Sequence, residues 1–250
     1  MPVLATAPDG ILRRVRRDVT DAVTAVLRRA ESARRGGRRD GDDVIPLGPR
    51  GERTRRALLS AGAEQVVARG YVATSVEHIH EAAGVSLGTY YLYFRDKADL
   101  MATLVGESIL ESADALFRPI DLTDGADGVR PVLERFVHSY ARSAGFQKAW
   151  EEATHVDDDL AALRRDVSQL IEGSLSDGIG AGQRAGIVDP SLDASSSARA
   201  LAAMVDRYCY LSFVVEDPPA SPDQVVDVLT RLWVASLGLR RRRRRRSLPS

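Results

Sequence analysis

Glu151, Glu152 and His155 have the spacing of metal ligands on one helical face, E-x-x-H and E-x-x-x-H. A di-iron helical bundle needs such a motif twice, together with two further carboxylates, and the sequence contains one copy. The remaining histidines form no spaced pair on a common face, and the single Cys209 excludes a multi-cysteine metal site. No nucleotide-binding or hydrolase motif occurs. We therefore expect no enzyme, no metal centre and no cofactor.

A second group of side chains has the chemistry to bind phosphate. Ser86 and Thr89 carry hydroxyls, Tyr91 and Tyr93 carry phenols, and Lys97 carries an ammonium group, all within one short segment. Hydroxyl and ammonium donors of this kind contact the backbone phosphates of nucleic acids. A free surface has no need of such a cluster, so the segment favours contact with DNA. Packing in a small core is the alternative for Tyr91.

Two short helices joined by a glycine turn are expected to position this cluster. Thr74 and Glu77 have capping-box spacing, in which the two side chains satisfy the first free amides of a helix. Gly84 suits the sharp turn that follows. Ser86 can then cap a second helix, from Leu87 to about Phe94. Two short helices with this connection form a helix-turn-helix.

Residues 53–100 resemble the N-terminal DNA-binding domain of the TetR family of bacterial transcriptional regulators. A lone glycine turn would be weak evidence, but here many positions agree in register over the whole segment. The detailed match covers about a fifth of the chain. The matching residues are Gly70, Tyr71, Thr74, Ser75, Val76, Ile79, Ala82, Ala83, Gly84, Val85, Ser86, Gly88, Thr89, Tyr91, Tyr93, Phe94, Lys97 and Leu100.

The resemblance implies that the second short helix enters the major groove and that flanking groups hold phosphates. Leu87 stands where many members have a polar or basic base reader, and Tyr90 stands where Leu is frequent. Thymine methyl groups or DNA shape are therefore the expected targets at these two positions. Gly88 permits close approach of the backbone. The predicted DNA-binding residues are Thr74, Ser75, Ser86, Leu87, Gly88, Thr89, Tyr90, Tyr91, Tyr93 and Lys97.

Positive charge is concentrated at the two ends of the chain, although 35 basic and 35 acidic side chains cancel overall. Residues 1–60 contain 14 Arg against 8 acidic residues, and residues 240–246 are all Arg. Residues 61–239 contain 14 basic against 27 acidic residues. This distribution indicates a polyanionic partner at one end of the molecule. Codon usage contributes to the abundance of Arg, so position is more informative than number.

Apolar residues recur at helical spacing almost throughout, which predicts an all-α fold with two domains. Residues 1–49 are expected to form a basic extension and linker, with an extra amphipathic helix at about 11–35. Residues 50–97 form the helix-turn-helix domain, residues 98–239 a helical effector-binding and dimerisation domain, and residues 240–250 a disordered Arg-rich tail. The extension could dock on the protein, remain a partly disordered arm, or bind a membrane or another partner. With no long apolar stretch and no export signal, we expect a cytoplasmic protein without membrane contact.

The last two expected helices, 194–215 and 222–239, each have one apolar face. The resemblance implies that they pair with the same helices of a second subunit in a four-helix bundle. The resulting two-fold homodimer would bind a palindromic operator in double-stranded DNA. The alternative is that these faces complete the core of the subunit. The predicted dimer residues are Leu201, Val205, Cys209, Phe213, Val225, Leu229, Leu232 and Trp233.

The resemblance also implies a cavity for a small effector, and hence a ligand-responsive repressor. Apolar candidates for its wall indicate an apolar or amphipathic effector, such as an acyl or terpenoid compound. Such a ligand would shift the helix expected at 97–117 and thereby change the separation of the two DNA-reading heads. Ordinary core packing is the alternative. The candidate wall residues are Phe117, Phe136, Tyr140, Phe146, Trp150, His155, Met204 and Tyr208.

A constitutive or architectural DNA-binding protein without an effector is the alternative function. The basic extension and the Arg tail favour it, because both add attraction to phosphates that does not depend on sequence. Such binding weakens steeply as salt is raised.

Overall fold

The computed structural model describes residues 48–111, 122 and 125–239, and within these ranges the chain is helical with no β-strand. Contacts divide it into two units. The helix predicted at about 11–35, Phe117 and the tail at 240–250 lie outside the described residues. None of the described helices is long and apolar enough to cross a membrane.

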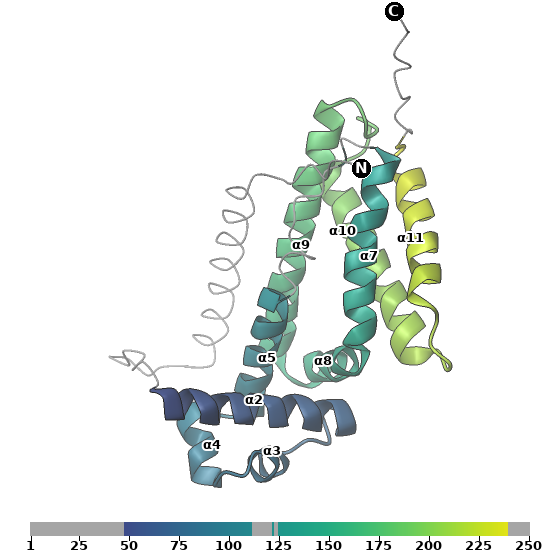
Figure 1. Cartoon of the computed structure of the whole chain (residues 1–250). Coiled ribbons are helices and arrows are strands. Elements are labelled where there is room, and N and C mark those ends of the chain that lie inside the picture. Colours follow the sequence, from purple (N-terminus) through teal and green to yellow (C-terminus); the bar gives the residue numbers. More distant parts are fainter. Residues whose placement is uncertain (1–47, 112–121, 123–124, 240–250) are drawn as a thin grey trace, which may run out of the picture. The chain divides into compact units, whose positions relative to one another are not determined.

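Unit 1 contains the helices around the predicted helix-turn-helix, together with a later segment of the chain that returns to them. In Figure 1, α3 and α4 lie on one side of α2. The later segment contributes α8 and the first residues of α9, and α8 packs against α2. The bounds are α2 Pro49–Arg69, α3 Val76–Ala82, α4 Leu87–Tyr93, α5 Lys97–Glu111, α8 Ala144–Val156 and α9 Asp158–Arg184.

The core of unit 1 takes one fully buried side chain from each of its first four helices. Leu58 of α2, Ile79 of α3, Tyr90 of α4 and Leu100 of α5 all have 0% exposed surface. Burial of an aliphatic side chain of this size contributes about 1.5–3 kcal/mol. Gly62 of α2 lets α5 approach closely, because a Cβ atom there would lie 2.6 Å from a methyl group of Leu100.

The helix cap before α3 lies one residue later than the sequence predicts. Ser75 is the cap: its hydroxyl accepts from the His78 amide, and the His78 ring accepts from the Ser75 amide. The Thr74 hydroxyl instead donates to two backbone carbonyls at the end of α2, at 2.7 and 3.1 Å. The prediction of a Thr74–Glu77 capping box is therefore wrong, because the Thr74 hydroxyl is hydrogen-bonded to these carbonyls instead.

The turn and the start of α4 agree with the sequence prediction. Gly84 has a φ of +67° between α3 and α4. The Ser86 hydroxyl caps α4 by accepting from the Thr89 amide at 3.1 Å. α3, the turn and α4 together form a helix-turn-helix, in which α3 contacts both α2 and α4.

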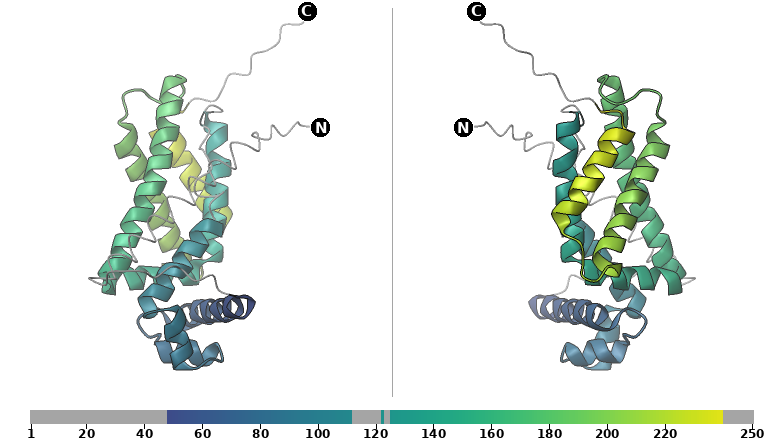
Figure 2. Two further views of the ribbon diagram at one scale, coloured as in Figure 1. Left: turned by 90° about the vertical axis from the view of Figure 1, so that its left-hand side faces the viewer. Right: turned by 90° about the vertical axis from the view of Figure 1, so that its right-hand side faces the viewer.

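Unit 2 contains the remaining helices. α7 (Ala126–Arg142) packs along α11 (Pro222–Ser236), and α10 (Ala194–Tyr210) contacts both. Figure 2 shows α11, in yellow, beside α10, in light green. The chain continues from α10 into a π-helical turn, η2 (Leu211–Val215). The later part of α9 also belongs to this unit.

Seven of the eight predicted dimer residues lie inside the subunit. Their side chains are at most 8% exposed, whereas Leu232 is 44% exposed. The apolar stripes of α10 and α11 therefore complete the subunit core, and the alternative interpretation of these faces holds for them. The buried seven are Leu201, Val205, Cys209, Phe213, Val225, Leu229 and Trp233.

Candidate DNA-binding site

α4 buries one side and exposes the other. Tyr90 is fully buried, and its hydroxyl donates to the Asp96 carbonyl at 3.0 Å. Burial also raises the pKa of this phenol well above its ordinary value. The prediction that Tyr90 contacts DNA is therefore wrong, since its side chain anchors α4 to the domain.

The opposite side of α4 is exposed and apolar. Leu87, Tyr91 and Leu92 are 38%, 52% and 82% exposed, and Gly88 is exposed between them. The sequence prediction includes Leu87, Gly88 and Tyr91 but omits Leu92. The signal that could have found Leu92 is its helical position, four residues after Gly88, which places it on the same face.

Hydroxyl groups surround the start of α4. Ser86 Oγ lies 2.9 Å from Thr89 Oγ1, in addition to its bond with the Thr89 amide. Ser86 is exposed and Thr89 is half-buried. One hydroxyl of the pair donates to the other, which leaves one hydroxyl proton for a phosphate or for water. Tyr93 is half-buried, and Ser75 is half-buried at the cap of α3. Thr74, by contrast, is only 2% exposed, so its side chain is not available to DNA.

Lys97 has internal partners. Its ammonium group donates to the carbonyls of Tyr71 and Thr74, both at 2.6 Å, and lies 4.1 Å from the centre of the Tyr71 ring. Partial burial lowers the pKa of the ammonium group. Lys97, which the sequence predicts to contact a phosphate, thus joins the start of α5 to the connection between α2 and α3.

α8 holds the same connection from another direction. The Val72 amide donates to the Glu152 carboxylate at 3.4 Å. Gly70 has a φ of +82° and a ψ of 163°, a conformation that is essentially restricted to glycine, and a Cβ atom there would lie 2.6 Å from that carboxylate. The connection between α2 and α3 is therefore tied to both α5 and α8.

The side chains of the three residues with metal-ligand spacing are each engaged in a different contact. Glu152 binds the Val72 amide, and the Glu151 carboxylate pairs with Arg164. A ring nitrogen of His155 lies 2.7 Å from the Glu151 carbonyl. Among the described residues, no group of three His, Cys, Asp or Glu side chains could hold a metal ion.

The predicted effector-pocket residues are divided between the two units. In unit 2, the ring centres of Phe136 and Tyr140 lie 6.0 Å apart, and the ring centre of Phe213 lies 6.4 Å from that of Tyr140. Met204 and Tyr208 are half-buried on α10. In unit 1, Trp150 is buried, Phe146 is half-buried and His155 is exposed. The effector pocket stays a prediction.

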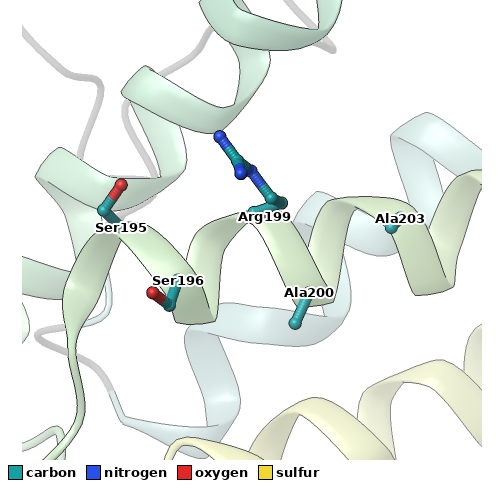
Figure 3. Close-up of a pocket in the computed structure, with 5 residues that line it drawn as sticks. All are labelled: Ser195, Ser196, Arg199, Ala200 and Ala203. Atoms are coloured by element: carbon teal, nitrogen blue, oxygen red, sulfur yellow. The ribbon is translucent and has the colours of Figure 1, made fainter.

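An open hollow of about 290 Å³ lies on the exposed side of α10 (Figure 3). Arg199 points towards α9, where its Nε donates to the Glu172 carboxylate at 3.2 Å. The hollow contains none of the predicted effector residues. Its lining is Ser195, Ser196, Arg199, Ala200 and Ala203.

Comparison with known proteins agrees with this geometry. Residues 58–104 match the family described as bacterial regulatory proteins, tetR family. Residues 129–238 match the C-terminal domain of the transcriptional regulator EthR. The HTH-type transcriptional regulator EthR of Mycobacterium tuberculosis is 27% identical over 202 residues, covering 76% of this chain and 93% of EthR.

Solved structures show the same fold. The fatty acid degradation regulator FadR from Bacillus halodurans has a TM-score of 0.63 at 19% identity, covering 78% of this chain and all of FadR. SmeT, the repressor of the Stenotrophomonas maltophilia multidrug efflux pump SmeDEF, has a TM-score of 0.60 at 20% identity, covering 74% of this chain and 91% of SmeT.

The second helix of the motif, α4, is held by its buried Tyr90 and exposes its other side to solvent. Together with the family matches, this arrangement defines a DNA-binding transcriptional regulator of the helix-turn-helix class. The chain belongs to the TetR family of bacterial transcriptional regulators.

Gly88 provides a direct test of this site. A methyl group there would meet only Ser86 Oγ, at 3.9 Å, so the fold itself has room for alanine. We expect Gly88→Ala to leave the free energy of unfolding unchanged or raise it by up to about 1 kcal/mol. Because the methyl group would stand between α4 and the groove, affinity for DNA should fall about tenfold, equivalent to 1.4 kcal/mol. Urea unfolding and fluorescence anisotropy with a labelled duplex would measure the two effects.

Gly173→Ala is the matched control, because Gly173 also lies in a helix with no atom within 4 Å of an added Cβ. It should leave DNA affinity unchanged. Equal affinity of Gly88→Ala and the wild type would contradict the placement of α4 against DNA.

Proposed function

We propose that this regulator is a homodimeric repressor whose two α4 helices bind a palindromic operator, and that a small effector releases it. The exposed face of α4 is the observation that carries the proposal. Burial of Tyr90 fixes which side of α4 faces outwards, so Leu87 and Gly88 are presented to a groove at the leading end of the helix.

Different groups of the site have different roles in this proposal. Leu87, Gly88 and Tyr91 approach the bases, because they lie on the exposed face of α4. The hydrogen-bonded Ser86–Thr89 pair donates its remaining hydroxyl proton to a phosphate, which orients the domain without reading sequence. Ser75 and Tyr93 can supply further hydroxyl contacts at the margins.

Selection of duplexes from a random DNA pool at about 150 mM salt tests the proposal, because non-specific phosphate binding is weak at this concentration. We expect enrichment of a two-fold symmetric motif with half-sites about one helical turn apart. Binding that disappears with salt regardless of sequence would instead support the constitutive or architectural alternative. The salt dependence of affinity for a scrambled duplex is the control.

We propose that the two subunits of the dimer contact each other through the outer faces of α10 and α11, and not through the buried apolar stripes of these helices. Ala200, Ala203 and Leu211 recur at helical spacing on the exposed side of α10 and its continuation, η2. On α11, Val228 and Leu232 are 39% and 44% exposed. Small side chains on one helix and apolar side chains on the other are suited to close helix packing between subunits.

Substitution of either face by arginine tests the dimer. Ala203→Arg and Leu232→Arg place a charge in the proposed interface, where desolvation without a partner is costly. We expect a dimeric wild type and variants that sediment as monomers at micromolar concentration. Val156→Arg, at a 62% exposed position of α8, is the control and should remain dimeric. A monomeric wild type, or dimeric variants on both faces, would contradict this interface.

The contacts of two side chains support transmission of an effector signal to α3 and α4. Lys97 at the start of α5 and Glu152 of α8 both hold the short connection at residues 71–74. A ligand that displaced α5 or α8 would therefore act on the segment that leads into α3. Coupling of this kind amounts to about 1–3 kcal/mol, or roughly 5- to 150-fold in operator affinity.

A release assay with the selected duplex tests the effector. The aromatic side chains Phe136 and Tyr140 favour an apolar or amphipathic compound, so the screen would begin with acyl and terpenoid compounds. We expect at least one to lower operator affinity within the range above and to raise the thermal midpoint of the free protein. Compounds that bind without changing operator affinity, or an absence of binders, would favour the alternative without an effector.

A further inference from the structure

The recognition face of α4 lacks the side chains that usually read bases. Its seven residues, LGTYYLY, contain no charged and no amide side chain. Bidentate hydrogen bonding to guanine by Arg or Lys, or to adenine by Asn or Gln, is therefore not available from this helix. Its two most exposed side chains are apolar or aromatic: Leu92 at 82% and Tyr91 at 52%.

These side chains form one continuous face. At about 100° per residue, Leu87, Tyr91, Gly88 and Leu92 lie at about 0°, 40°, 100° and 140° around the helix axis. The two leucines therefore stand at the margins of the exposed face, with the glycine between them. Tyr90, on the other side, has no exposed surface.

Gly88 provides an independent indication that something approaches this face closely. It is not in the left-handed region, and a methyl group there would meet nothing nearer than Ser86 Oγ at 3.9 Å. Neither backbone conformation nor packing within the chain therefore requires glycine at this position, although glycine weakens a helix relative to alanine. The absence of a side chain is useful when another molecule lies against the backbone.

The major groove offers one apolar group on its base edges, the C5 methyl group of thymine. We propose that Leu87 and Leu92 read thymine methyl groups in the operator, so that apolar contact on both sides of Gly88 specifies A·T pairs. This inference rests on the proposed function, in which α4 enters the major groove. It makes Leu92 a specificity-determining residue and predicts a motif with thymines in each half-site.

Replacement of thymine by uracil tests the inference, because it removes the methyl group and leaves base pairing unchanged. Each thymine of the selected duplex would be replaced singly, and affinity measured by anisotropy with the wild-type protein. We expect a loss of about fourfold at the positions under α4, the equivalent of about 0.8 kcal/mol for one buried methyl-sized group. Positions outside the half-sites should show no change.

Alanine variants of the two leucines determine which leucine contacts which thymine methyl group. Leu87→Ala and Leu92→Ala should each bind the thymine duplex more weakly, and each should lose the penalty for uracil at its own position, as in a double-mutant cycle. Val156→Ala, a similarly exposed apolar position on α8, is the control and should keep every uracil penalty. Urea unfolding would verify that the variants are folded, as expected for exposed positions.

Several outcomes would overturn the inference. Selected half-sites without thymine, or uracil duplexes that bind as tightly as thymine duplexes, would show that the leucines do not read methyl groups. Uracil penalties that persist unchanged in both leucine variants would indicate an effect of DNA shape instead. Failure to select any motif would contradict the proposed function itself, so the two failures are distinguishable.

Discussion

A seven-residue helix is not stable in water by itself, so the recognition surface of this regulator depends on how α4 is anchored. Tyr90 is the anchor: it is fully buried, and its hydroxyl binds the Asp96 carbonyl. Its ring also packs against two neighbouring aromatic rings. Because the anchor occupies one side of α4, the side that carries Gly88 and Leu92 is left exposed, with Leu87 at its margin, and we propose this side as the surface that contacts DNA.

The connection before α3 has a comparable role for the rest of unit 1. Carbonyl groups at Tyr71 and Thr74 accept from the Lys97 ammonium, and the Val72 amide donates to the Glu152 carboxylate. The Lys97 cation thus satisfies two carbonyl acceptors of this short irregular segment, and the Glu152 anion satisfies one of its amide donors. The arrangement keeps backbone polar groups paired where no regular helix can pair them. It also joins α5 and α8 to the helix-turn-helix.

Unit 2 shows how one helix can serve two surfaces. Cys209 on the inner side of α10 is fully buried, and burial raises the pKa of its thiol to about 12, so it behaves as an inert packing group. The outer side of the same helix carries Ala200 and Ala203, which are exposed. The inner stripe contributes to the core of the subunit, and the outer stripe is the surface that we propose for contact with a second subunit.

The sequence by itself determined the helix-turn-helix, because its signals are local: a glycine at the turn, Ser86 at the cap and apolar residues at helical spacing. It also indicated which helices have an apolar side. It did not identify what each side packs against, since an apolar stripe such as that of Leu201 and Val205 has the same pattern in a subunit core and in an interface. Hydrogen bonds that the pattern does not reveal decided the roles of Thr74 and Lys97. The Thr74 hydroxyl donates to carbonyls four and nine residues earlier, at the end of α2. The Lys97 ammonium donates to carbonyls 23 and 26 residues earlier, which only the folded chain brings within reach.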